Sequence, residues 1–265
     1  MATTGARHTT DQPSVRTPPV LAPPILCSSE PAASGAFYAA LLGWRHEPAA
    51  TGPGGLFRLA EEVVARWIPA DDRDAAATWL PAFAVRDTSA AVRRVRAAGG
   101  TPLPGPPGGS PGRSTAFTDP TGARFALGAQ PTLADGPGSL GWTELFSTDT
   151  AAAKAFYRSA LGWRGQDIPF EGGTYTVLTR AAGSPTGADG LDGHAGIRQL
   201  HPAEAATGLR SHWLPYLEVK EVDQAVADAL GLGATLRTPA RHTPGLGRCA
   251  RLADPQGAEF AVLTG

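Results

Sequence analysis

Phe37-Tyr38 and Leu42-Gly43-Trp44-Arg45 decide the fold, because both blocks return in the second half of the chain as Phe156-Tyr157 and Leu161-Gly162-Trp163-Arg164. Two further blocks return in the same order. Trp79-Leu80-Pro81 recurs as Trp213-Leu214-Pro215, and Asp119-Pro120-Thr121-Gly122-Ala123 recurs as Asp254-Pro255-Gln256-Gly257-Ala258. Matched blocks in one order over nearly the whole chain indicate an internal duplication.

The duplication divides the chain of 265 residues into two domains. We predict a disordered tail over residues 1–20, a first domain over 21–130, a linker over 131–140 and a second domain over 141–265. The tail is polar and has no apolar segment of the kind found in secretory signals. The junction between the copies is rich in proline and glycine, as linkers often are.

Each copy has the same rhythm of elements. We expect helices over Pro31–Leu42 and Thr150–Leu161, because a glycine follows each of them in the position that ends a helix. A second strand and helix follow in each copy, and tight Asp-Pro turns precede the predicted last strands, Arg124–Gly128 and Glu259–Leu263. The aromatic residues of the repeated blocks are expected in the core.

The repeated blocks resemble a known superfamily. A helix reading F-Y-x-x-x-L-G-W and a terminal D-P-x-G-x-x-F hairpin are similar to those of the vicinal oxygen chelate superfamily, which includes glyoxalase I, bleomycin-resistance proteins and extradiol dioxygenases. The resemblance covers Leu21 to Gly265. It implies an α+β fold of tandem glyoxalase-like domains, in which four βαβββ modules form half-open barrels. It does not specify an activity, since that fold hosts unrelated functions.

Composition excludes several classes of partner. A net charge of -1 gives no electrostatic basis for nucleic-acid binding, which needs clustered basic charge. No apolar run approaches the roughly 20 residues of a membrane-spanning helix. The two cysteines form no disulfide framework, so we expect a cytoplasmic setting.

The metal ligands of the superfamily can be tested position by position. Metal-dependent members place His, His or Gln, and Glu on three strands. The matching residues here are Trp142, Leu214 and Ala261 in the second copy and Pro23, Leu80 and Ala126 in the first. None of these side chains can ligate a divalent ion, so we expect no metal and no other cofactor. A register shifted by one, using Glu144, His212 and Glu259, is the alternative.

Alternation along the strands predicts which side chains face the ligand. The second concave face is expected to include Trp142, Glu144, Phe146, Tyr216, Glu218 and Glu259, and the first to include Ile25, Cys27, Ala82, Ala84 and Arg124. The opposite parity is apolar and is expected under the helices: Leu145, Trp213, Leu217, Val219, Phe260, Val262, Phe83, Val85, Phe125 and Leu127. A slip of one residue would bury Glu144 beneath a helix.

A flat aromatic ligand suits a concave face with this composition. The candidate ligand-binding residues are Trp142, Glu144, Phe146, Tyr216, Glu259, Trp67, Tyr175 and Arg124. Aromatic side chains can stack on such a ligand, and a carboxylate can accept a hydrogen bond from it. In the competing interpretation Glu144 is structural and meets Arg124, Arg58 or a backbone donor, because a buried carboxylate without a partner is costly.

Three functions compete at this stage. The first is a metal-independent protein that binds a bulky aromatic molecule, such as an anthracycline-like polyketide, for antibiotic resistance or as a biosynthetic accessory beside a partner oxygenase. The alternative is a cofactor-free isomerase, cyclase or hydroxylase-type enzyme, with Glu144 as a weak candidate for the acid/base. A metal-dependent lyase or dioxygenase is disfavoured by the six apolar positions. A monomer and a homodimer both stay open.

Overall fold

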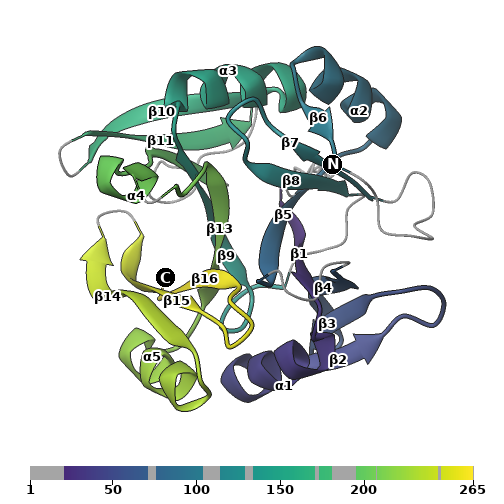
Figure 1. Cartoon of the computed structure of the whole chain (residues 1–265), viewed down its shortest axis with the longest axis vertical. Helices are drawn as coiled ribbons and strands as arrows, with labels where there is room; N and C mark the ends of the chain where they lie inside the picture. Colours follow the sequence, from purple (N-terminus) through teal and green to yellow (C-terminus); the bar gives the residue numbers. More distant parts are fainter. Residues whose placement is uncertain are drawn as a thin grey trace, which may run out of the picture.

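Two eight-stranded sheets form the framework of the protein (Figure 1). The computed structural model describes residues 21–70, 76–103, 114–128, 134–170, 173–180, 195–206, 208–243 and 246–264. The tail predicted over residues 1–20 lies outside these ranges. Within them, no helix has the length and apolar character needed to cross a membrane.

The first domain follows a strand-helix-three-strand order twice. Its elements are β1 (Leu21–Ser28), α1 (Pro31–Leu42), β2 (Arg45–Pro48), β3 (Gly55–Leu59), β4 (Glu62–Pro69), β5 (Thr78–Ala84), α2 (Thr88–Ala97), β6 (Thr101–Pro102), β7 (Ser114–Thr118) and β8 (Arg124–Gly128).

The second domain repeats this order with one added helix. Its elements are β9 (Leu140–Ser147), α3 (Thr150–Leu161), β10 (Trp163–Phe170), β11 (Gly173–Arg180), β12 (Ala195–Gln199), α4 (Pro202–Ala206), β13 (His212–Glu218), α5 (Val222–Gly231), β14 (Thr235–Thr243), β15 (Gly247–Ala253) and β16 (Glu259–Leu263). No sequence pattern predicts α4, because five residues are too few for a periodic pattern.

Each sheet joins two βαβββ modules edge to edge. The strand orders are β2-β3-β4-β1-β5-β8-β7-β6 and β10-β11-β12-β9-β13-β16-β15-β14. The modules meet through the antiparallel pairs β1–β5 and β9–β13. This is the α+β tandem arrangement that the repeated blocks predict.

The helix ends confirm the predicted boundaries of α1 and α3. Gly43 and Gly162 each follow their helix in the left-handed conformation, with φ of 73°, which only glycine adopts without strain. Asp149 caps α3, and its side chain accepts a hydrogen bond from the backbone N–H of Ala152. The two repeated L-G-W blocks are therefore helix stops that lead directly into the next strand.

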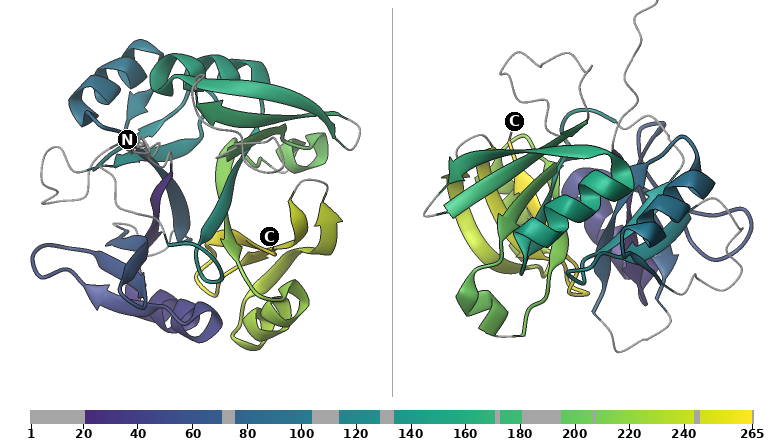
Figure 2. Two further views of the ribbon diagram at one scale, coloured as in Figure 1. Left: turned by 180° about the vertical axis from the view of Figure 1, so that it is seen from behind. Right: turned by 90° about the horizontal axis from the view of Figure 1, so that it is seen from above.

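A single core joins the helix-facing sides of both sheets. It contains Leu145, Trp213, Phe260, Phe83 and Phe125, as the predicted parity requires. The helices pair across the two domains: α1 lies beside α5, and α2 lies beside α3 (Figure 2). The concave faces of the two half-barrels consequently point away from each other.

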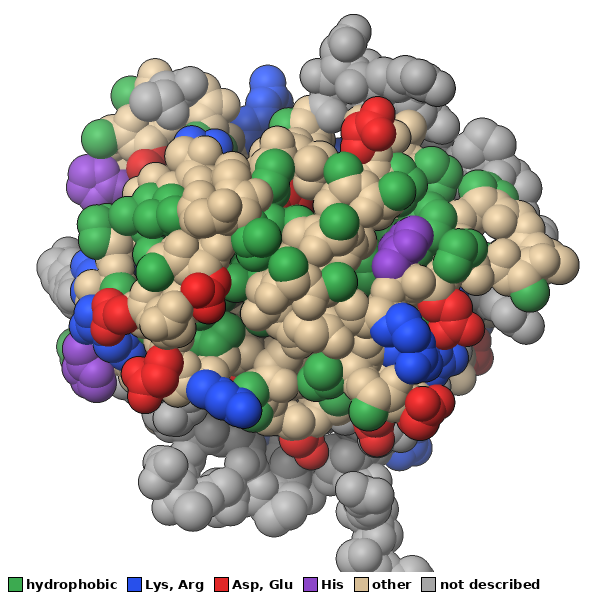
Figure 3. Space-filling model, turned by 90° about the horizontal axis from the view of Figure 1, so that it is seen from below, with side chains coloured by type: hydrophobic (Ala, Val, Ile, Leu, Met, Phe, Trp, Pro, Cys, Tyr) green, Lys and Arg blue, Asp and Glu red, His purple; other side chains and the backbone are tan. Residues whose placement is uncertain are grey.

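Charged side chains are dispersed over the lower face of the molecule. Figure 3 shows Lys and Arg interspersed with Asp and Glu on this face, with hydrophobic side chains between them. This mixture agrees with the net charge of -1. Among the described residues of this face, the basic side chains do not form a continuous patch.

Candidate functional site

A cavity of about 570 Å³ opens on the concave face of the second sheet. It lies among side chains of β9, β12, β14 and β15, with α4 at its edge. Its lining residues are Glu144, Phe146, Phe170, Gly173, Thr174, Arg198, Gln199, Leu200, His201, Pro202, Glu204, Tyr216, Thr238, Arg241, Thr243, Leu246, Cys249, Ala250 and Arg251.

Strand register brings these side chains together. Arg198 on β12 lies beside Phe146 on β9, and Arg251 on β15 lies beside Ala261 on β16. Tyr216 on β13 is the neighbour of Ala261 on its other side. Laterally paired residues of a sheet project to the same face, so backbone pairing places all of these side chains on the concave side.

Glu144 lies at the inner end of the cavity and is buried. The hydroxyl of Tyr216 donates a hydrogen bond to its carboxylate, and the hydroxyl of Tyr175 bonds it as well. Burial raises the pKa of Glu144, while the two phenols and the charges of Arg198 and Arg251 act in the opposite direction. Glu144 is therefore a buried, hydrogen-bonded carboxyl whose protonated form is favoured relative to an exposed one.

Gly196 makes room for the second of these phenols. A Cβ at this position would lie 1.8 Å from the hydroxyl oxygen of Tyr175. Gly196 is the strand neighbour of Glu144, so the phenol crosses directly over β12 to reach the carboxyl group. The indole N–H of Trp142 donates to the same hydroxyl at 3.0 Å and fixes its orientation.

The ring of Phe146 contacts three polar side chains, those of His212, Arg198 and Arg251. The His212 ring is parallel to it, with ring centroids 5.1 Å apart. The guanidinium carbons of Arg198 and Arg251 each lie 4.5 Å from the centre of the Phe146 ring. Both arginines are thus held by cation–π contacts at the cavity wall.

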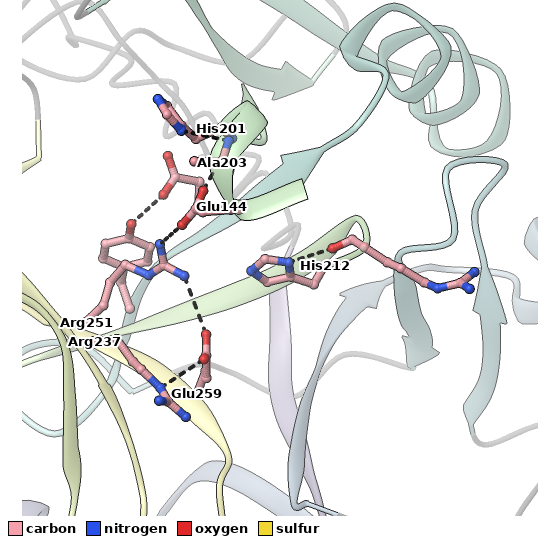
Figure 4. A network of polar contacts seen from close by, with 10 residues as sticks. Glu144, His201, Ala203, His212, Arg237, Arg251 and Glu259 are labelled. Atoms are coloured by element: carbon pink, nitrogen blue, oxygen red, sulfur yellow. Dashed lines mark hydrogen bonds and ion pairs between the residues drawn. The ribbon is translucent and has the colours of Figure 1, made fainter. Parts of the chain in front are cut away.

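Arg251 connects the cavity to a chain of ion pairs (Figure 4). Its guanidinium lies 3.3 Å from Glu204 and 3.4 Å from Glu259. Arg237 pairs with Glu259 on the other side at 3.1 Å. Glu259 therefore positions an arginine of the cavity wall and does not itself line the cavity.

The structure distributes the predicted ligand-binding residues over four places, of which the ion pairs of Glu259 are one. Glu144, Phe146 and Tyr216 line the cavity. The hydroxyl of Tyr175 bonds Glu144, and the indole N–H of Trp142 donates to that hydroxyl.

Two of the predicted residues, Trp67 and Arg124, lie in the first domain and do not line this cavity. Trp67 belongs to the shared core, because its strand neighbour Leu26 faces the helices. The idea that Arg124 or Arg58 partners Glu144 is wrong. Arg58 pairs with Glu47 at 2.6 Å, and the partners of Glu144 come from its own domain.

Several lining residues escaped the sequence analysis. Arg198 is the one charged residue of the strand Ala195–Gln199, and Arg251 is one of two arginines in the strand Gly247–Ala253. The alternation rule would have placed them on the concave face, had the bounds of these strands been known. Phe170, at the end of a long hairpin, and Glu204, on the short helix α4, carry no such signal.

Known proteins are similar to this chain in sequence over most of its length. A family model described as a glyoxalase-like domain matches residues 25–128 and 143–263, nearly the whole of both domains. The chain belongs to the glyoxalase-like domain family. Among related glyoxalase-like proteins, "Anthracycline biosynthesis protein DauV" of Streptomyces sp. strain C5 is 33% identical over 263 residues, which cover 90% of each chain. CFP32 of Mycobacterium bovis, named as a candidate glyoxylase, is 30% identical over 254 residues, covering 90% of this chain and 92% of CFP32.

Solved structures show the same glyoxalase-like fold. The 2,3-dioxygenase LapB from Pseudomonas sp. KL28 has a TM-score of 0.63 and 14% sequence identity, covering 94% of this chain and 93% of LapB. LapB is an extradiol-type member of the vicinal oxygen chelate superfamily. At 14% identity the similarity shows the fold alone, so the chemistry of the site is inferred from the residues of this chain.

The donor set of this glyoxalase-like protein does not fit the metal of that superfamily. Trp142, Leu214 and Ala261 do converge on the second concave face, where they pack with Phe146 and Tyr216 as an apolar cluster. Leu80 and Ala126 do the same in the first domain. The fold thus assembles the position of the metal and fills it with side chains that cannot donate an electron pair.

The alternative register for a metal site uses side chains that are largely engaged within the protein. Glu144 is bonded to Tyr216, and the Nδ1 atom of His212 is bonded to the carbonyl of Arg210 at 2.9 Å. Glu259 is held by Arg237 and Arg251. Over the described part of the chain, three or more His, Cys, Asp or Glu side chains do not gather anywhere in a way that would hold an ion.

The first glyoxalase-like domain has a different concave face. Its cluster consists of small and aliphatic side chains: Ala22, Ile25, Leu80, Ala82 and Ala126, with Cys27, Ile68 and Ala84 against them. Burial raises the pKa of Cys27 to about 11, so its thiol is unreactive at neutral pH. The duplicated domains have therefore diverged on their concave faces.

Proposed function

We propose that the second domain binds a flat polycyclic aromatic molecule of the anthracycline class, without a metal ion, in a biosynthetic accessory or self-resistance role. The observation that carries this proposal is the cavity on the concave face, walled by aromatic side chains and arginines beside the apolar cluster of Trp142, Leu214 and Ala261. The 33% sequence identity to DauV, a protein named for anthracycline biosynthesis, supports this chemical class of ligand.

The size of the cavity agrees with such a ligand. At about 570 Å³ it lies within the range of roughly 300–1,000 Å³ typical of small-molecule sites. Phe170 is half-buried at its edge and offers an aromatic surface, with its ring centroid 5.4 Å from that of Tyr175. The planar guanidinium of Arg198, which lies over the Phe146 ring, offers a second flat surface to the ligand, because arginine stacks on aromatic rings.

A cofactor-free enzyme is the second candidate, and one observation favours it. Glu144 is a buried carboxyl with a raised pKa at the inner end of the cavity, which is a typical environment for a general acid. The hydroxyl of Tyr216, which also lines the cavity, is hydrogen-bonded to Glu144 and provides a path for a proton. Conversion of a bound aromatic molecule in the absence of any cofactor would decide for this second function.

Calorimetric titration with daunomycinone, an anthracycline aglycone, tests the proposal. We expect binding by the protein after treatment with EDTA. Phe170→Ala should weaken binding about 10-fold, because it removes an aromatic contact and its buried area. The control Leu236→Ala removes a side chain that is 37% exposed and does not line the cavity, so it should leave the affinity unchanged.

Two results would contradict the proposal. One is that the aglycone does not bind to the folded protein at all. The other is that Phe170→Ala and Leu236→Ala bind it with the same affinity as the wild-type chain, since the ligand would then occupy some other surface.

A further inference from the structure

The charges around the cavity are unequal. Three arginines line it, Arg198, Arg241 and Arg251, against two acids, Glu144 and Glu204. The oxygens of Glu144 are taken up by the hydroxyls of Tyr216 and Tyr175. The cavity therefore presents an excess of cationic hydrogen-bond donors to whatever enters it.

Arg198 differs from the other two arginines. Arg251 has Glu204 and Glu259 as partners, and Arg241 also has interactions within the protein. Arg198 makes no hydrogen bond or ion pair with any residue of the described ranges, and its guanidinium is held only by its contact with the Phe146 ring and by the field of Glu144. A half-buried guanidinium carries five N–H donors, which favour an oxygen acceptor.

Both arginines on Phe146 add positive charge to the cavity wall. Each guanidinium carbon lies 4.5 Å from the centre of the same ring, and both side chains line the cavity. The acids on Arg251 offset its charge from the far side, through Glu204 and Glu259. The Nε atom of Arg251 is buried and has no partner within the described ranges.

We infer that the aromatic ligand carries a carboxylate, which Arg198 binds, and that the cavity selects acidic aromatic molecules over neutral or amine-bearing ones. This inference rests on the proposed function and specifies its ligand class. Guanidinium and carboxylate match as two parallel hydrogen bonds, which gives arginine its preference for this group. An amine-bearing ligand, such as an aminoglycosylated anthracycline, would instead bring a further cation to an arginine-rich wall.

Two isosteric probes separate charge from shape. Anthraquinone-2-carboxylate and anthraquinone-2-carboxamide share the same flat ring system and differ in the charge of one group. We expect the wild-type chain to bind the carboxylate at least about 10-fold more tightly than the carboxamide, because a hydrogen bond between charged groups increases affinity by roughly a factor of ten. Added salt should reduce this preference, because it screens partly exposed charges.

Arg198→Gln provides the decisive variant. It should bind the two probes with nearly equal affinity, because its side chain carries no charge, and its far-UV circular dichroism should match that of the wild-type chain, which shows that it is folded. Arg164→Gln is the matched control, because Arg164 on β10 is exposed and lies outside the cavity. It should retain the wild-type preference for the carboxylate.

The outcomes separate this inference from the proposed function. Equal affinity of the wild-type chain for the two probes, or an unchanged preference in Arg198→Gln, overturns the inference and leaves aromatic binding intact. Loss of both probes in Arg198→Gln, with Arg198→Lys binding them equally, also overturns it, because Arg198 would then be structural. If the folded wild-type chain does not bind daunomycinone, the proposed function fails, whatever the two probes show.

Discussion

Glu144 is the residue on which the site is centred. A carboxylate moved from water into a protein interior is costly unless donors replace the lost hydration. Two phenols supply those donors, and Gly196 leaves the space through which one of them reaches the carboxyl group. The sequence predicted that Glu144 faces the ligand side and has a partner. It could not predict which partner, because Tyr175 lies on a hairpin strand that no repeated block anchors.

The titration of Glu144 gives a prediction for stability. Its folded pKa lies above the usual value of 4.5, so folding takes up a proton between these two values. The contribution that protonation of Glu144 makes to the free energy of unfolding is therefore fully present below pH 4.5. It is lost as the pH rises through the pKa of Glu144 in the folded protein.

Urea unfolding of the wild-type chain and of Glu144→Gln over a pH series measures this effect. The free energy of unfolding of the wild-type chain minus that of the variant should decrease from acidic toward neutral pH, because glutamine does not titrate. Other titrating groups, such as Asp254, contribute equally to both proteins and cancel in the difference. A difference that stays constant or increases with pH would show that the environment of Glu144 is not as described.

The repeated blocks meet each other across the two domains at the scale of elements. The hydroxyl of Tyr38 on α1 donates to Asp254 at 3.1 Å, and that of Tyr157 on α3 donates to Asp119 at 3.0 Å. Each hydroxyl in turn accepts an indole N–H, from Trp79 at 2.9 Å or from Trp213 at 2.8 Å. Three of the four blocks that reveal the duplication therefore belong to two equivalent buried networks.

The sequence predicted the separate elements of this network but not their connection. Helix bounds, glycine stops and core aromatics follow from local patterns, and the structure confirms them. The pairing of Tyr38 with Asp254 spans 216 residues, so no local pattern expresses it. The resemblance predicted the half-open barrels. Only the structure shows the contact between the F-Y helix of one domain and the Asp-Pro turn of the other.

Tyr157→Phe tests the importance of this network. The variant leaves one oxygen of Asp119 and the indole N–H of Trp213 without a partner in a buried site. We expect a loss of about 1–3 kcal/mol in the free energy of unfolding, measured with urea. Tyr38→Phe should cost a similar amount, because it makes the same change in the other copy.

Ser159→Ala, on the exposed face of α3, is the control and should change stability by less than about 0.5 kcal/mol. If Tyr157→Phe were no more destabilising than this control, the hydroxyl would have no structural role in joining the domains.

At the scale of the whole molecule, the two domains share one core. Phe37 and Tyr38 of the first domain contact the ring of Phe260 in the second, and Phe83 contacts Trp163 and Trp213. Separation of the domains would expose this aromatic surface to water, which is unfavourable. The duplicated halves are therefore expected to fold as one unit, although only one of them carries the proposed ligand site.

Equilibrium unfolding measures this coupling. Tryptophan fluorescence and far-UV circular dichroism should report one coincident transition, because both halves lose the same core together. Tyr38→Phe and Tyr157→Phe should shift the midpoint of that one transition. Two separate transitions, each sensitive to only one of these variants, would show that the domains are independent.

The most direct test of the account is the affinity for daunomycinone together with the metal content of the same sample, before and after exhaustive treatment with EDTA. The account predicts that affinity is unchanged by the treatment and that addition of zinc, iron or nickel does not increase it. Loss of binding on chelation, with recovery on return of one of these ions, would contradict the account, because side chains in the barrel would then be holding the ion.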